Sequence, residues 1–292
     1  MKKLFALITL LLSTGIQAAQ DRDIYDVMYL PDAGTVYGFT TLGFGKIKLE
    51  SDDLGDEDFD GFELDQTLGY ALTDRFSLEV NLSYADVEGD PEGGEKYDAV
   101  KGVSDPSLLA RLRTVDEVFR WDLIGGAIVN FQDREIERDR DTNNTQGGHS
   151  FIAGTELGTK TENVQWMVGA FLVHNLESET EVKTALGDGT IEYDSNNELV
   201  VRTSLLHRLH EKNFLRWRAQ ANFTEEVGHD RETLLSKRAP QSIYEGGLEY
   251  QYAASEDLLV RVGGTYQYLN TRTGQIDDFY GWNAYLGANY QF

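Results

Sequence analysis

The chain contains no cysteine, which excludes disulfide bridges, thiol catalysis and cysteine-based metal sites. Only 4 of its 292 residues are proline, which suits long paired strands because proline lacks the backbone N–H that a sheet requires. Basic residues number 26 against 50 acidic ones, and the net charge of −24 argues against nucleic acid as a partner. After the first residues, no apolar run approaches the roughly 18 residues of a membrane-spanning helix.

The N-terminus has the pattern of a secretory signal peptide. Two lysines precede the apolar run 4–12, small and polar residues follow, and Ala18 stands at the expected cleavage position. The sequence therefore predicts an exported protein whose signal peptide, residues 1–18, is cleaved.

The C-terminal end alternates with the period of a β-strand. Every second residue from Tyr280 to Phe292 is aromatic or aliphatic, and the residues between them are polar, small or, at Tyr285, aromatic. Such a strand can lie between lipid and water. A terminal aromatic strand of this kind resembles the closing strand of bacterial outer-membrane β-barrels, where it is also the recognition signal for the barrel assembly machinery. Tyr290 and Phe292 are the candidate assembly signal.

Short turns alternate with long polar stretches along the chain, as in outer-membrane barrels with short periplasmic turns and longer extracellular loops. The predicted turns lie at 73–75, 116–117, 161–163, 211–213 and 255–257. The predicted loops, many of them acidic, lie near 51–60, 87–105, 132–148, 177–196, 227–240 and 270–277.

We predict an all-β fold, a closed antiparallel transmembrane β-barrel of about twelve strands over residues 34–292. The strands are expected near 34–50, 61–72, 76–86, 105–114, 119–132, 149–160, 164–176, 196–209, 214–226, 241–253, 258–269 and 278–292. Residues 19–33 are predicted as a periplasmic N-terminal segment, either a free tail or a segment tucked into the lumen.

Alternation assigns faces to these strands, because successive side chains point to opposite sides of a sheet. The residues expected to face lipid include Phe76, Leu78, Val80, Leu82, Tyr84, Trp217, Phe223, Tyr244, Leu248, Tyr250, Tyr252, Val260, Val262, Tyr266 and Tyr268. The charged residues of the strands then face inward. The candidate pore-lining residues are Glu63, Asp65, Glu79, Arg111, Arg113, Arg120, Asp122, Glu156, Arg202, Arg216, Arg218, Glu245, Glu249 and Arg261.

Two interpretations of these charges stay open. They could form a structural network of arginine–carboxylate pairs that braces a small barrel. They could also form a selectivity path in which arginines attract anions opposite a carboxylate wall. Apolar inward positions either fill space or line a patch for an aromatic or aliphatic solute; they are Ile124, Ile128, Met167, Phe171 and Val173.

One short motif points to a family. The segment from Gly102 to Arg113 reads Gly-Val-Ser-Asp-Pro-Ser-Leu-Leu-Ala-Arg-Leu-Arg, and it resembles the outer-membrane proteins of the meta-pathway phenol-degradation transporter family. The resemblance implies passage of small hydrophobic or aromatic compounds across the outer membrane. Ser104 replaces the family's usual glycine, and no Lys-Tyr pair precedes Arg113. On physical grounds alone, Asp105 caps a turn and Pro106 starts a strand.

The sequence does not favour catalysis or a metal site. His149 and Ser150 are adjacent and point to opposite faces, as do His207 and Ser204, which is poor geometry for a catalytic pair. The acidic stretch 51–60 is expected to be solvated. The stretch after Asp139 begins like a calcium loop but lacks its glycine and its closing glutamate. We therefore expect no enzyme, no cofactor and no metal.

The function predicted from the sequence is an outer-membrane channel or transporter for small solutes, among them aromatic, hydrophobic or small acidic compounds. The first alternative is a structural or adhesion barrel with a plugged lumen, which an inward-docked 19–33 segment would favour. The second is a lipid-modifying enzyme. The expected partners are outer-membrane lipid and lipopolysaccharide, the assembly machinery and a small solute. Solute identity and oligomeric state are open.

Overall fold

The computed structural model describes residues 24–50, 56–116, 118–132, 134–136, 142–145, 147–161, 163–184, 187–225, 227–228, 237–238, 241–271 and 278–292. Every regular element in these ranges is a β-strand. In this part of the chain, no helix is long and apolar enough to cross a membrane.

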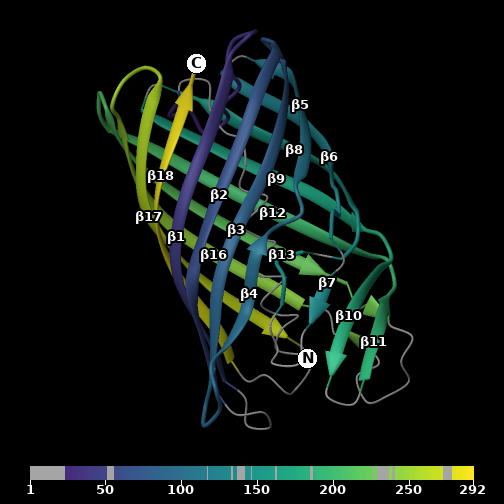
Figure 1. The fold of residues 1–292 in the computed structure, drawn as a ribbon. Helices are drawn as coiled ribbons and strands as arrows, with labels where there is room; N and C mark the ends of the chain where they lie inside the picture. Colours follow the sequence, from purple (N-terminus) through teal and green to yellow (C-terminus); the bar gives the residue numbers. More distant parts are fainter. Residues whose placement is uncertain are drawn as a thin grey trace.

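Twelve strands form a closed antiparallel ring (Figure 1). Each pairs with its neighbours along the ring, and β1 pairs with β18 to close it. They are β1 (Val36–Glu50), β2 (Glu57–Thr73), β3 (Phe76–Pro91), β5 (Ser107–Asp116), β6 (Phe119–Ile128), β8 (Ser150–Lys160), β9 (Val164–Asn175), β12 (Asn196–His210), β13 (Asn213–Thr224), β16 (Gln241–Ala253), β17 (Leu258–Thr271) and β18 (Asp278–Gln291). The predicted fold class and strand count are confirmed.

The two ends of the barrel differ. Short turns join β2 to β3, β5 to β6, β8 to β9, β12 to β13 and β16 to β17 at one end, which we call the short-turn end. The C-terminus lies there (Figure 1). Phe292 exchanges two backbone hydrogen bonds with Val36. The opposite, long-loop end carries the longer connections. All five predicted turns are therefore confirmed.

Along the ring strands, exposed apolar residues alternate with buried inward ones. On β3, Leu78, Val80 and Leu82 are exposed, whereas Ser77 and Glu79 are buried. The same pattern confirms the outward assignment of Trp217, Phe223, Tyr244, Leu248, Tyr250, Tyr252, Val260, Val262, Tyr266 and Tyr268. A charge on such a face near the membrane midplane costs roughly 2–4 kcal/mol, which explains why the strand charges turn inward.

Shorter strands lie at the long-loop end (Figure 1). They are β4 (Tyr97–Val103), β7 (Arg134–Ile136), β10 (Ser178–Thr184), β11 (Gly187–Tyr193), β14 (Val227–Gly228) and β15 (Lys237–Arg238). The loops predicted over 87–105 and 177–196 are therefore wrong in part, because β3 runs on to Pro91 and pairs with β4, and β10 pairs with β11. Outward positions there, such as Asp86 and Glu88, are charged, so the apolar alternation that marks a membrane strand is missing.

Apolar clusters fill much of the interior. At the long-loop end, Val182, Ile191 and Tyr193 of β10 and β11 pack with inward residues of the ring, including Phe59 and Phe279. A second cluster holds the predicted inward residues Ile124, Phe171 and Val173 together with Leu109, Ile152 and Val200, and Ile128 packs against it. Met167 lies in a third cluster at the short-turn end. These residues pack against one another, as expected if they fill space.

Candidate functional site

The candidate pore-lining residues all lie on inward-facing positions, but they separate into two groups around the barrel. Those on β5, β6, β8 and β12 form a buried charge network, which we define as Arg111, Arg113, Arg120, Asp122, Glu156 and Arg202. Those on β13, β16 and β17 form what we call the arginine wall, defined as Arg216, Arg218, Glu245, Glu249 and Arg261. Glu63, Asp65 and Glu79 lie between them on β2 and β3.

Arg111 is the centre of the buried charge network. Its Nη1 donates to Asp122 and to Glu156, each at 2.8 Å. Arg202 also pairs with Glu156, and its guanidinium lies over the Phe171 ring, 4.5 Å from the centroid. The strand register explains this convergence, because Asp122 and Glu156 are cross-strand partners on β6 and β8. Each buried charge thus meets an opposite one, which offsets the large cost of removing it from water.

Arg113 and Arg120 extend the network to the N-terminal segment. Arg113 Nε donates to Asp122 at 2.8 Å, and its Nη2 donates to the Met28 carbonyl at 2.6 Å. Arg120 pairs with Asp26 at 3.3 Å. The buried charge network therefore connects the barrel strands with a segment that precedes β1.

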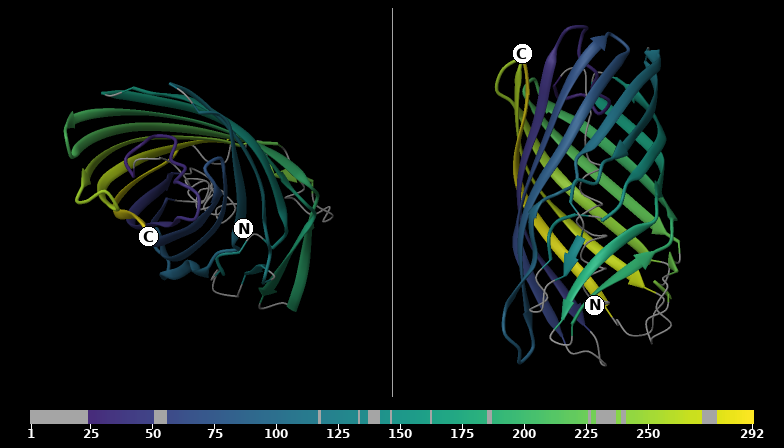
Figure 2. Two further views of the ribbon diagram at one scale, coloured as in Figure 1. Left: turned by 90° about the horizontal axis from the view of Figure 1, so that it is seen from above. Right: turned by 45° about the vertical axis from the view of Figure 1, so that its right-hand side comes forward.

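Residues 24–30, which we call the plug segment, lie inside the short-turn end of the barrel (Figure 2). Asp26 is fully buried and accepts a hydrogen bond from Gln165 at 2.7 Å, while Gln165 accepts one from the Val27 amide. Tyr25 stacks on Phe214 with ring centroids 4.5 Å apart. Of the two placements left open for the N-terminal segment, the structure shows residues 24–30 in the lumen.

The arginine wall is less closed than the buried charge network. Arg261 pairs with Glu249 at 3.4 Å, and Arg218 pairs with Glu245 at 3.7 Å. Arg218 also lies over the Tyr285 ring, 4.8 Å from the centroid. As whole residues, all three arginines of the wall are partly exposed, although the Nε atoms of Arg218 and Arg261 are buried.

The β2 and β3 acids occupy the remaining arc. Glu79 is buried and accepts a hydrogen bond from the Tyr37 hydroxyl at 2.7 Å. Glu63 is also buried, and Asp65 is partly exposed. The predicted carboxylate wall is thus interrupted by aromatic and uncharged partners.

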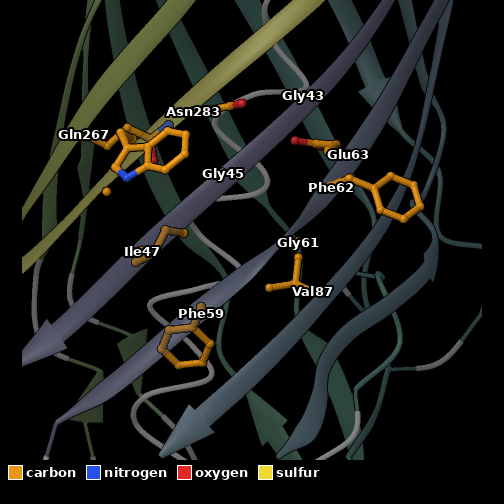
Figure 3. Close-up of a pocket in the computed structure, with 12 residues that line it drawn as sticks. Gly43, Gly45, Ile47, Phe59, Gly61, Phe62, Glu63, Val87, Gln267 and Asn283 are labelled. Atoms are coloured by element: carbon orange, nitrogen blue, oxygen red, sulfur yellow. The ribbon is translucent and has the colours of Figure 1, made fainter.

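A small cavity lies beside Glu63, between β18, β1, β2 and β17 (Figure 3). Its volume is about 60 Å³, which is room for a few water molecules. Gly43 and Gly45 open its floor, because a Cβ at Gly43 would lie 3.0 Å from the Asn283 amide group. The Asn283 amide and the Glu63 carboxyl lie on either side of Gly43 (Figure 3), so the cavity is polar at one end and apolar near Phe59.

The histidines do not assemble a catalytic pair with serine in the described residues. His207 is exposed on the outer face, and Ser204 is buried on the inner face. His149 accepts a hydrogen bond from the Asn130 amide at 3.0 Å, and His174 contacts Asn197. Among the described residues, no group of three or more His, Asp or Glu side chains could hold a metal ion. Residues 51–55 and 137–141 of the acidic loops lie outside the described residues.

Sequence reasoning missed two participants in these groups. Asp26 lies in a short polar stretch without periodicity, so nothing in the pattern assigns it to Arg120. Tyr285 interrupts the small and polar face of the last strand, and this irregularity was the available signal for its contact with Arg218 and Glu249.

Comparisons with known proteins identify the fold. No family model and no curated protein matches the sequence. Among solved structures, an outer membrane channel from Pseudomonas putida F1 matches with a TM-score of 0.64 and 12% identity, covering 90% of this chain and 97% of that one. The NanC porin matches at 0.49 with 8% identity, over 86% and 98% of the two chains. The translocator domain of the autotransporter NalP from Neisseria meningitidis matches at 0.48 with 12% identity, over 89% of each.

The likeness to the P. putida channel establishes a shared fold, that of an outer-membrane β-barrel. The other two similarities are too weak to support an argument. The resemblance to the phenol-degradation transporter family stays a prediction.

Proposed function

We propose that the protein is a bacterial outer-membrane channel that passes small solutes through its lumen. The observation that carries the proposal is the arginine wall, because a lumen serving only to brace the barrel has no need of charged groups in contact with water. The P. putida structure of similar fold is described as a channel, which agrees with this proposal.

In this conformation the plug segment narrows the short-turn end, which we take as the periplasmic side. Passage therefore requires the plug segment to move. Asp26 is the residue to test, because it contacts both Arg120 and Gln165 on the inner face of the barrel strands. Removing its carboxylate weakens docking while the ring of strands stays paired.

The test is single-channel conductance of the refolded protein in a planar bilayer, compared with the Asp26→Ala variant. We expect wild type to conduct in brief or small openings and Asp26→Ala to open more often. Asp32→Ala is the matched control, because Asp32 is exposed in the same N-terminal stretch and should leave conductance unchanged. A heat-modifiable gel shift shows that each variant is folded.

The second candidate is a structural or adhesion barrel with a plugged lumen, which acts through its acidic loops. The inward position of residues 24–30 favours it. If wild type and Asp26→Ala are both folded and both silent, this candidate replaces the channel.

The solute class is the finer part of the proposal. The resemblance of residues 102–113 to the phenol-degradation transporter family favours aromatic compounds, and the arginine wall favours acids. Outer-membrane lipid, lipopolysaccharide and the assembly machinery, through Tyr290 and Phe292, are the partners proposed with it. No catalytic role is proposed. Assays for lipase activity are worthwhile only if the folded barrel shows no conductance.

A further inference from the structure

We propose that Arg216 forms a subsite for a small carboxylate in the lumen. The inference rests on the proposed channel function and names the solute chemistry that this site takes. The other arginines of the arginine wall and of the buried charge network each have a carboxylate partner. For Arg216, no carboxylate of the described residues forms such an ion pair.

The Arg216 side chain is oriented and retains spare donors. Its Nε donates to the Ser204 hydroxyl at 2.8 Å, which fixes one edge of the guanidinium group. The two terminal nitrogens then remain as a planar fork, the arrangement that binds the two oxygens of a carboxylate. Because Arg216 is partly exposed, a solute in the lumen can reach this fork.

The nearest acid by register does not use these donors. Glu249 is the cross-strand partner of Arg216 on β16. Its carboxylate instead accepts from Gln251 at 2.6 Å, from the Tyr285 hydroxyl at 3.0 Å and from Arg261 at 3.4 Å. With these three donors, Glu249 is largely satisfied, and Arg216 is left available to a ligand.

Arg216 lies on the long-loop side of the plug segment. Arg216 lies next to Phe214 on the same inward face of β13, and Phe214 stacks on Tyr25 of the plug segment. Arg218 follows on that face and adds a second positive charge. A carboxylate bound at Arg216 would therefore lie above the plug segment and beside the guanidinium group of Arg218, which Glu245 already pairs.

Calorimetric titration of the folded protein in detergent with sodium benzoate tests the subsite without relying on conductance. We expect saturable benzoate binding to wild type and an affinity loss of about tenfold or more in Arg216→Met, as for a lost charge-assisted hydrogen bond. Arg216→Lys keeps the charge without the fork and should fall between the two. Arg208→Met is the matched control, because Arg208 lies at the rim and contacts the Glu211 carbonyl.

Two parallel titrations identify the ligand chemistry. Sodium chloride reports a simple anion, and benzyl alcohol reports an uncharged ring of similar size. The subsite is overturned if Arg216→Met binds benzoate as tightly as wild type does, or if Arg208→Met loses as much benzoate affinity as Arg216→Met. It is also overturned if benzyl alcohol binds as tightly as benzoate.

Reversal potentials in a salt gradient separate the subsite from the channel proposal. We expect anion preference in wild type and a several-fold lower anion-to-cation permeability ratio in Arg216→Met. If the permeability ratio is the same in wild type and Arg216→Met and benzoate does not bind, the subsite is overturned and the channel is retained. Benzoate binding in a silent barrel overturns the channel and retains the subsite.

Discussion

The buried charge network and the arginine wall face the same lumen with the same residue types. They differ in their exposure to water and in whether each arginine has a carboxylate partner. In the buried charge network, Arg111 contacts two carboxylates and is almost fully buried. In the arginine wall, Arg216 has a serine partner and is partly exposed. A charged lumen is therefore not a single functional unit.

The difference shows that a partly exposed arginine without a carboxylate partner, and not charge itself, marks the candidate site. A buried arginine that is paired with carboxylates cannot bind a solute without losing these partners, which is costly in a dry environment. A partly hydrated arginine exchanges water for a ligand at much lower cost. The buried charge network also binds the plug segment through Arg113 and Arg120, so it positions the plug, whereas the arginine wall is the surface that we propose for the solute.

The largest expected contrast is in stability. Arg111→Met leaves Asp122 and Glu156 short of a partner in a buried site, and we expect the free energy of unfolding to fall by about 3–5 kcal/mol. Arg216→Met removes one hydrogen bond and one of the three positive charges near Glu249 but no ion pair, so we expect a smaller loss of about 1–2 kcal/mol. Urea unfolding in lipid vesicles, followed by tryptophan fluorescence, measures both. Equal losses would mean that the two groups are equally structural.

A charge change within the arginine wall should move selectivity in the opposite direction from Arg216→Met. Glu249→Gln removes the negative charge surrounded by Arg216, Arg218 and Arg261 while keeping a similar shape. We expect the anion-to-cation permeability ratio to rise a few-fold, because the local potential becomes more positive. Reversal potentials measure this change.

Glu79→Gln is the control for that experiment, because Glu79 is a buried inward acid bonded to Tyr37, away from the arginine wall. It should leave the permeability ratio nearly unchanged. A ratio that falls in Glu249→Gln would contradict the assignment of the arginine wall as the selective surface.

The ring strands and their faces were predictable because the membrane imposes a rule on every second residue. Leu78, Val80 and Leu82 must be apolar to face lipid, and this alternation is visible without any partner. The rule ends where the lipid ends, so β4, which contains Asp98 and Lys101, has the sequence pattern of a loop.

The pairings inside the lumen were not predictable in the same way. Inward residues follow no hydropathy rule, and the contact of Arg111 with Glu156 depends on the register of three strands, β5, β6 and β8. The pair of Asp26 with Arg120 forms only because a segment outside the strands folds back into the barrel. Alternation could place Arg216 inward, but its lack of a carboxylate partner appears only when the side chains of the neighbouring strands are placed.

The smallest expected effect separates orientation from charge at Arg216. Ser204→Ala removes the hydroxyl that accepts from Arg216 Nε, and we expect a stability loss of about 0.5–1.5 kcal/mol. Benzoate affinity should weaken by roughly threefold, because a guanidinium that is no longer held must be ordered on binding. Thr203→Ala is the matched control, since its hydroxyl donates to the Met167 carbonyl at 2.9 Å from the adjacent position on the outer face. Thr203→Ala should lower the stability by a similar amount without changing the benzoate affinity. Equal affinity losses in both variants would show that Ser204 acts only through the stability of the barrel.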